Sequence, residues 1–396
     1  MTNERKFVDH DRAIELIAAI PRSELNSIVG ILLDNRNVAL IGDWSASPVG
    51  KSYGTGTIGI CIVRGIAEIA GQQQNWSMAA KVLDLSMAGN TAADSARSEI
   101  EAYSSGLLDS LLGAGMPDSR FRAANCYGVT EFQKDDVFII WLEDLSHLPD
   151  PPWNDDVYAM SAKHLGHFNA AWLLNPPENR SWFHQDGYRA RFSTGPQKRL
   201  KMRDNQDDKY VRLVASSAVL DGYEWLTSNL DRVFDHLQTI ESPLSHTDAQ
   251  PKNLFPGTAP DGSAETIAID WSMLGYAALG TDAANLVGSS LFWLEIDVSH
   301  AMHLEQVVFE SYLEGLQELG WRGRREFVWL GYLTVATCRA ANGSNFPGQW
   351  IGNDKLRDSM ITNLGHTPTD MANHWREVFE WMFPRFKAAT EKAGIL

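Results

Sequence analysis

The sequence has few cysteines, no long apolar run and a shortage of positive charge, and each shortage argues against a class of protein. Among 396 residues only three are cysteines, Cys61, Cys126 and Cys338, and they are far apart and form no CxxC pair. This argues against a disulfide framework or a zinc–thiolate site and is typical of a reducing cytosol, so we expect a cytoplasmic location. No run reaches the roughly 20 apolar residues of a membrane-spanning helix.

Positive charge is scarce, since 34 Lys and Arg stand against 50 Asp and Glu and give a formal net charge of −16. A protein that binds nucleic acid needs a basic surface to displace counterions, and an anionic membrane surface also attracts basic segments. We therefore expect neither nucleic acid nor a membrane as partner. The negative charge slightly favours a cationic small molecule. The composition makes no prediction of the oligomeric state.

Hydrophobic residues make up 44% of the chain, which is enough for a sizeable core, and the length favours two lobes. Two short helices, separated at Pro21, are expected first. Apolar runs typical of strands then occur at 38–41, 60–63, 78–83 and 137–142. Helical periodicity dominates afterwards, at 157–174, 213–239, 302–319 and 371–393, with a break or kink expected at Pro384. The sequence thus predicts an α+β fold with a strand-rich first part and a helical second part.

The most informative stretch is an H-x-D-x-x-x-x-N pattern at His246, Asp248 and Asn253, followed 17 residues later by Asp270 at the end of an apolar strand. Phosphoryl transfer uses such groups. One carboxylate takes the proton of the acceptor hydroxyl, while an amide oxygen and a second carboxylate hold Mg²⁺ on the nucleotide phosphates. The alternative is an ordinary polar surface loop. The full pattern, with Pro251 inside it, favours the functional interpretation.

A kinase-type site also needs a lysine on a strand and a helical glutamate that holds it. Lys81 lies inside the apolar run 78–83, where an unpaired ammonium is costly to bury. Glu99 follows 18 residues later at the start of a helix expected over 98–112, and Glu101 is its competitor on another helix face. The alternative for Lys81 is a solvated lysine on an edge strand.

A G-x-G-x-x-G motif places Gly54, Gly56 and Gly59 just before the strand-like run at 60–63. Glycines let backbone amides approach phosphate groups closely. A Rossmann motif needs a strand before the glycines and a helix after them. Here β-branched residues follow, so a hairpin over the nucleotide is favoured.

Together these residues resemble the aminoglycoside phosphotransferase and choline kinase superfamily, which has a protein-kinase-like fold. The likeness extends over roughly Val38 to Asn285. Further segments that carry it are Ile269-Asp270-Trp271, Gly275, Gly280-Thr281-Asp282-Ala283-Ala284 and Ser98-Glu99-Ile100-Glu101-Ala102-Tyr103, where Ser98 replaces a usual Arg.

The resemblance implies a role for each matching residue. Asp248 would be the catalytic base, and Asn253 and Asp270 would be Mg²⁺ ligands. Lys81 would bind the ATP phosphates, with Glu99 as its ion-pair partner.

The resemblance also implies an interlobe hinge at Leu142-Glu143-Asp144-Leu145, in which the Glu143 carbonyl and the Leu145 N–H face the purine. Asp282 would brace the catalytic loop without touching substrate. Two positions depart from the family, Thr247 where Gly is usual and Gln250 where His is common. Thr247 is expected to be a small change, whereas Gln250 removes an ionisable neighbour of Asp248.

The resemblance therefore implies a bilobal kinase-like fold, with an N-lobe at 1–144 and a helical C-lobe at 145–396 that carries the catalytic loop and the acceptor site. The implied function is transfer of the ATP γ-phosphoryl group, with Mg²⁺, to a hydroxyl of a small molecule such as an aminoglycoside or another natural product. A metabolite kinase acting on choline, homoserine or a sugar is one alternative. A nucleotide-binding pseudokinase with a regulatory role is the other.

His164 and His167 are spaced i, i+3 and could share one helix face as metal ligands. The sequence shows no third ligand near them. We therefore expect both histidines to be structural.

Overall fold

Strands dominate the first third of the chain and helices the rest. The computed structural model describes residues 9–49, 56–87, 90–108, 120–132, 136–148, 153–185, 187–193, 195–205, 208–341 and 354–395. The contacts divide the chain into two compact units. Unit 1 contains Met1–Pro117, Arg122–Asp150 and Ile267–Ser272, and unit 2 contains Asp118–Phe121, Pro151–Thr266 and Met273–Leu396.

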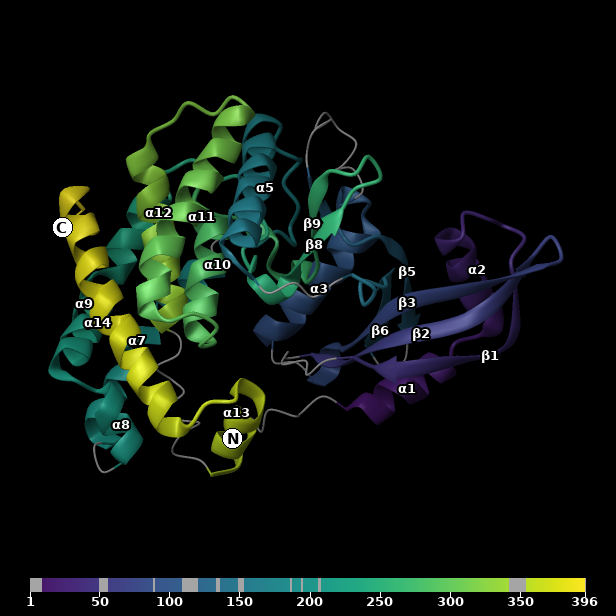
Figure 1. The fold of residues 1–396 in the computed structure, drawn as a ribbon, viewed down its shortest axis with the longest axis horizontal. Coiled ribbons are helices and arrows are strands. Elements are labelled where there is room, and N and C mark those ends of the chain that lie inside the picture. The colour runs from purple at the N-terminus through teal and green to yellow at the C-terminus, as the bar shows by residue number, and fades with distance from the viewer. Residues whose placement is uncertain are drawn as a thin grey trace. The chain divides into compact units, whose positions relative to one another are not determined.

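Unit 1 is built on a five-stranded antiparallel sheet (Figure 1), whose strand order is β1-β2-β3-β6-β5. Its strands are β1 (Ala39–Pro48), β2 (Thr57–Ile69), β3 (Gln72–Asp84), β5 (Cys126–Phe132) and β6 (Val137–Glu143). The predicted hairpin is found as the β1–β2 pair. Helix α3 (Asn90–Ser104) follows β3 after the short 3-10 turn η1 (Leu85–Met87).

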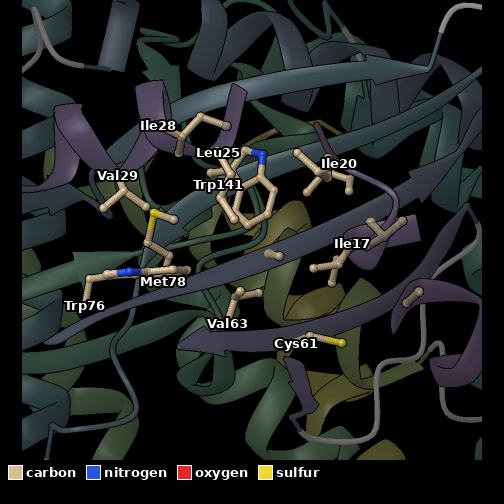
Figure 2. Packing of buried hydrophobic residues seen from close by; sticks show 14 of the residues in the cluster. Ile17, Ile20, Leu25, Ile28, Val29, Cys61, Val63, Trp76, Met78 and Trp141 are labelled. Carbon is tan, nitrogen blue, oxygen red and sulfur yellow. The ribbon is translucent and has the colours of Figure 1, made fainter. Parts of the chain in front are cut away.

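One face of this sheet is covered by α1 (His10–Ala18) and α2 (Arg22–Leu32), which are separated at Pro21 as predicted. Figure 2 shows side chains of both helices gathered around the buried ring of Trp141, with Met78 of β3 in the same cluster. Neighbouring residues of a strand point to opposite faces. Since Met78, Ala80 and Val82 of β3 belong to this core, Lys81 lies on the face that α1 and α2 leave uncovered.

Unit 2 is mainly helical. Its helices are α5 (Asp155–Leu174), α6 (Gly187–Phe192), α7 (Gly195–Leu200), α8 (Lys209–Val214), α9 (Ser217–Leu237), α10 (Thr281–Phe292), α11 (Val298–Glu318), α12 (Arg325–Ala341), α13 (Asp354–Leu364) and α14 (Pro368–Lys392). Figure 1 shows α5, α10, α11 and α12 side by side, in agreement with their contacts. In the part of the chain that the structure describes, no helix combines the length and apolar character needed to span a bilayer.

Short strands also occur outside the five-stranded sheet. They form one sheet of order β4-β9-β8, from β4 (Phe121–Ala123), β9 (Ala264–Ala268) and β8 (Leu254–Thr258), and one pair of β10 (Gly275–Tyr276) with β7 (Leu244–Ser245). The 3-10 turns η2 (Lys201–Asn205), η3 (Pro251–Asn253) and η4 (Trp271–Met273) complete the elements.

The predicted α+β class, with a strand-rich first part and a helical second part, is confirmed. Besides the helices α6, α7, α8 and α13, the sequence analysis missed α10 and α12. Every residue of α10 is buried, as is most of α12, so neither shows the alternation of polar and apolar faces that signals a helix. A break or kink was expected at Pro384, and the helix is not broken there, because α14 continues through that residue.

Gly280 begins α10 at a position that no other residue fits. Its φ is +95°, and a Cβ there would overlap the backbone of Val328 and Tyr332 on α12. We expect Gly280→Ala to lower the free energy of unfolding by about 2–4 kcal/mol, because left-handed strain and overlap with backbone atoms add. The measurement is chemical denaturation.

Gly262 provides the matched control, since its φ is +86° but nothing lies within 4 Å of its missing Cβ. Gly262→Ala should therefore cost only about 1 kcal/mol, the conformational part alone. Equal losses for the two variants would show that the contact between α10 and α12 does not require glycine.

Candidate functional site

In unit 1, the carboxylates of Glu99 and Asp270 converge on the ammonium group of Lys81. Nζ of Lys81 on β3 donates hydrogen bonds to both carboxylate oxygens of Glu99 on α3, each at 2.7 Å. It also lies 3.1 Å from Oδ1 of Asp270. Lys81 and Glu99 are only 8% and 1% exposed. The predicted partner is thus Glu99, while its competitor Glu101 is exposed.

The charges in this cluster are mutually dependent. Burial by itself lowers the pKa of Lys81, but the negative charges of Asp270 and Glu99 outweigh burial, and the pKa is raised overall. Burial raises the pKa of Glu99 to about 7, against the opposing effect of Lys81 and with a further upward contribution from Asp270. Lys81 is consequently charged, which is the form that binds phosphate oxygens.

The backbone holds Asp270 in a turn directly after β9. Its φ is +62°, in the left-handed region, which Asp tolerates better than most residues. The next residue, Trp271, is fully buried, and its indole N–H donates to the carbonyl of Ala268 at 3.3 Å. This anchor keeps the turn in place, and the side chain of Asp270 remains 34% exposed.

The structure explains one of the three predicted nucleotide-binding glycines by packing. Gly59 lies in β2 against α1, where a Cβ would come within 2.9 Å of the Cβ of Ala13. Gly56 precedes β2 with φ +95° and accepts a hydrogen bond from the N–H of Asp84 at 2.7 Å. Gly54 lies outside the described residues. Contact of these glycines with phosphate stays a prediction.

The predicted hinge residues lie at the end of β6: Leu142 and Glu143 are its last two residues, and Asp144 and Leu145 follow it. The carboxylate of Glu143 accepts two hydrogen bonds from Arg122, at 2.6 and 3.0 Å, and one from the N–H of Asn125 at 3.1 Å. Burial opposes ionisation of Glu143, but the bonds from Arg122 and Asn125 prevail and its pKa is lowered. The Glu143 carboxylate is therefore engaged by Arg122 and Asn125, and contact of this segment with a purine stays a prediction.

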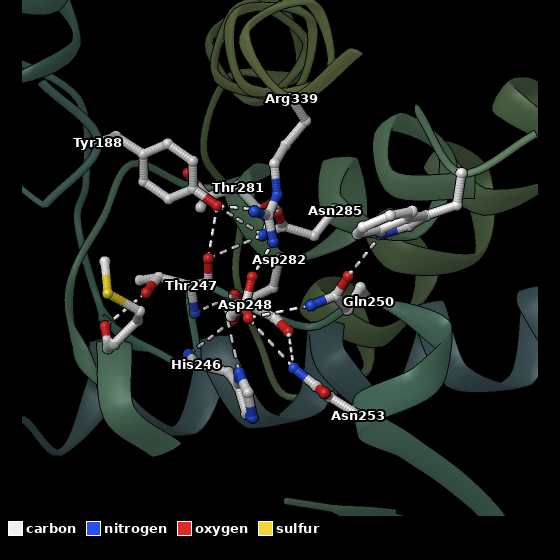
Figure 3. A network of polar contacts seen from close by, with 12 residues as sticks. Tyr188, His246, Thr247, Asp248, Gln250, Asn253, Thr281, Asp282, Asn285 and Arg339 are labelled. Atoms are coloured by element: carbon white, nitrogen blue, oxygen red, sulfur yellow. Dashed lines mark hydrogen bonds and ion pairs between the residues drawn. The ribbon is translucent and has the colours of Figure 1, made fainter. Parts of the chain in front are cut away.

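In unit 2, the carboxylate of Asp248 lies at the centre of a polar network (Figure 3). Its Oδ2 accepts hydrogen bonds from the side-chain amides of Gln250, at 3.0 Å, and Asn253, at 3.2 Å. Its Oδ1 accepts from the guanidinium of Arg339 on α12. The amide of Asn253 also donates to the backbone carbonyl of Asp248 at 2.9 Å. The carboxylate is held from both sides.

Asp282 braces this loop as expected. It is fully buried at the start of α10 and accepts hydrogen bonds from the backbone N–H groups of His246, at 3.1 Å, and Thr247, at 2.7 Å. Asn169 donates to the same carboxylate at 3.0 Å. Burial raises the pKa of Asp282, and these hydrogen bonds and His246 oppose the rise.

Threonine at position 247, where the resembling family usually has glycine, was expected to be a small change, but its backbone conformation makes the change costly. Its φ is +61°, a conformation in which a β-branched residue is strained and glycine is not. The hydroxyl donates to the carbonyl of Met273, which offsets part of this cost. Substitution of glycine by threonine is therefore compensated locally by a hydrogen bond that glycine cannot make.

Sequence reasoning missed Arg339, Asn285 and Tyr188, which surround the same loop. Nε of Arg339 donates to Oδ1 of Asn285 at 2.6 Å, and the amide of Asn285 donates to the carbonyl of Thr247 at 3.2 Å. The hydroxyl of Tyr188 also contacts the carbonyl of Thr247. One signal was available: an arginine within an otherwise apolar helical segment must find a charged partner.

The predicted metal ligands carry oxygen atoms, which Mg²⁺ prefers. The amide nitrogen of Asn253 is used by Asp248, and among the described residues its Oδ1 accepts no hydrogen bond. That oxygen therefore suits a cation. Within the described ranges, no group of three or more His, Cys, Asp and Glu side chains could hold a metal ion. A site using Asn253 would need the nucleotide phosphates as further ligands.

His164 and His167 lie on α5 and make separate contacts. Nδ1 of His164 is 2.9 Å from the hydroxyl of Thr266, and Nε2 of His167 is 2.7 Å from the carboxylate of Glu318. Each ring is thus engaged by a neighbouring side chain, and the structural role of the two histidines stays a prediction.

Buried His164 makes stability depend on pH. Burial lowers its pKa from 6.5 to about 4, so below pH 6.5 the unfolded chain binds a proton that the folded chain does not. Stability is complete above pH 6.5 and falls as the pH drops toward 4, by about 3 kcal/mol from this group. We expect His164→Gln to flatten the free energy of unfolding over this interval, measured by urea denaturation at each pH. An unchanged slope for His164→Gln would contradict the assignment.

No protein-family model matches this sequence, and no curated protein matches it significantly. Several solved structures are similar in fold. The amicoumacin kinase hAmiN, in complex with AMP-PNP, Ca²⁺ and Ami, aligns with 91% of this chain and 95% of its own at 12% identity and a TM-score of 0.49.

Two further structures are similar. An aminoglycoside phosphotransferase from Alicyclobacillus acidocaldarius aligns with 81% of this chain and 90% of its own, at 14% identity and a TM-score of 0.46. A choline kinase from Cryptosporidium parvum aligns with 89% of this chain and 91% of its own, at 12% identity and a TM-score of 0.46.

Proposed function

We propose that this protein is a small-molecule kinase that transfers the γ-phosphoryl group of ATP to a hydroxyl group of its acceptor. The observation that carries the proposal is the convergence of Lys81, Glu99 and Asp270. Each was chosen from the sequence for one role in phosphoryl transfer. In kinases the lysine–glutamate ion pair must be in place for the lysine to bind phosphate.

In this proposal, Lys81 binds phosphate oxygens while Glu99 fixes the direction of its ammonium. Asn253 and Asp270 would hold Mg²⁺, which neutralises charge on the transferring phosphoryl group when bound. Gly54, Gly56 and Gly59 would place backbone amides at the phosphates. The N–H of Leu145, which donates to no described residue, would bind the purine with the carbonyl of Glu143.

Asp248 would act on the acceptor. The acceptor oxygen forms a bond to the γ-phosphorus as the bond from that phosphorus to the bridging oxygen breaks, and ADP leaves. The hydroxyl proton passes to the carboxylate of Asp248. The amides of Gln250 and Asn253 would hold this carboxylate in position to receive the proton.

The acceptor class that the sequence resemblance favours is an aminoglycoside or another hydroxylated natural product, with choline, homoserine or a sugar as alternatives. The test is a thermal-shift screen of these compounds with Mg-ATP, followed by detection of ADP and a phosphorylated product. A ligand that binds the folded state raises its melting temperature by mass action. Nucleotide binding without ADP release from any acceptor, or water, would support the pseudokinase alternative.

A further inference from the structure

The guanidinium of Arg339 contacts Asp248 in the interior of unit 2. Arg339 lies near the end of α12, is 7% exposed and donates to Oδ1 of Asp248. Asp248 itself is 8% exposed. Neither charge is stable alone in such a place, because removal from water is compensated only by a close opposite charge with good geometry.

Arg339 also holds the loop that carries Asp248. Its Nε donates to Oδ1 of Asn285 at 2.6 Å, while the amide of Asn285 donates to the carbonyl of Thr247 at 3.2 Å. One planar group therefore fixes both the carboxylate and, through Asn285, the neighbouring backbone. Lysine lacks the rigid fork that satisfies two acceptors at once.

The hydrogen bonds to Asp248 leave one acceptor position of its carboxylate unused. A carboxylate offers about four acceptor positions. Among the described residues, Gln250 and Asn253 take both positions on Oδ2, and Arg339 takes one on Oδ1. The remaining position is therefore on the oxygen that Arg339 contacts. The opposite side is fixed further by Trp293, whose indole N–H donates to Oε1 of Gln250 at 3.4 Å.

We propose that Arg339 is a positioning residue that fixes the carboxylate of Asp248 so that Oδ1 faces the hydroxyl of the acceptor. The proposal rests on the proposed function, since it takes Asp248 as the group that receives the proton. It adds Arg339, which is 91 positions from Asp248 in the sequence, to the residues of the proposed site. It also assigns Oδ1 of Asp248 as the oxygen that receives the proton.

The test compares Arg339→Lys and Arg339→Ala with the full-length protein, using Mg-ATP hydrolysis by water as the readout, since the acceptor is unidentified. We expect Arg339→Lys to lower kcat about 10- to 100-fold, with KM for Mg-ATP within about twofold, because misplacement by about 1 Å can cost 100-fold. Arg339→Ala should lose more activity and recover part of it in millimolar guanidinium chloride. Arg325→Ala, at the exposed start of the same helix, should keep the wild-type kcat, and guanidinium chloride should not raise it.

A lysine variant with unchanged kcat, or an increase in KM alone, would overturn the proposal. Crystal structures of the wild type and Arg339→Lys test the geometry without activity, since the plane of the Asp248 carboxylate should turn in the variant. An unchanged carboxylate would overturn the positioning role. If the wild type hydrolyses no ATP with water, the two structures decide the orientation, and the proposed function is tested separately by the acceptor screen. Melting temperatures establish that each variant is folded.

Discussion

Asp248→Asn should abolish turnover and leave the nucleotide bound. The substitution keeps the size of the side chain but removes the oxygen charge that would receive the proton. General-base catalysis contributes about 10²- to 10⁴-fold, so we expect kcat to fall by that factor. The Kd of Mg-ATP should change by less than about threefold, because Lys81 and Asp270 are untouched. ADP release measures the expected fall in kcat, and calorimetry measures the Kd of Mg-ATP.

Asp231→Asn is the matched control, since it makes the same chemical change at an exposed aspartate of unit 2. It should leave kcat and Kd unchanged. Because Asp248→Asn also takes the opposite charge from Arg339, its melting temperature must be measured with its activity. A folded Asp248→Asn variant with wild-type kcat would remove Asp248 from the reaction.

Replacement of Lys81 should produce the largest combined effect on stability and activity. In Lys81→Met, the carboxylates of Glu99 and Asp270 lose the ammonium that both contact. Loss of one partner from a buried ion pair costs about 3–5 kcal/mol, and the part-exposed Asp270 places the expected loss near the lower end. Nucleotide affinity and kcat should also fall, because the cation for the phosphates is gone.

The double variant Lys81→Met with Glu99→Gln separates the two effects. It removes the uncompensated buried charge, so stability should recover by about 2 kcal/mol relative to the single variant. Activity should not recover, since the phosphate-binding cation is still absent. A double variant as active as the wild type would show that Lys81 serves only the fold.

The local parts of the site could be predicted because each has a sequence pattern of its own. Lys81 interrupts an apolar strand, and Asp248 and Asn253 share one short loop, so spacing alone identified them. The residues alone left Glu99 and Glu101 as candidate partners of Lys81, and the family resemblance implied Glu99. The two helices before β1 were predictable from their apolar spacing and from Pro21.

The network around Asp248 could not be predicted, because its members come from separate helices. Arg339 is 91 residues from Asp248, and α10 and α12 are buried too evenly to show a helical face. Which residue of one buried helix meets which residue of another depends on tertiary packing, and a single sequence does not contain that information. The left-handed conformation of Thr247 is similarly set by its surroundings, since a threonine does not favour it.

The most direct test of the central claim is a crystal structure of the full chain with Mg²⁺ and a non-hydrolysable ATP analogue. We expect the ammonium of Lys81 on a phosphate oxygen and Mg²⁺ bound by Oδ1 of Asn253 and the carboxylate of Asp270. Phosphates bound elsewhere, or a metal ion that neither Asn253 nor Asp270 touches, would contradict the assignment of this protein as a kinase.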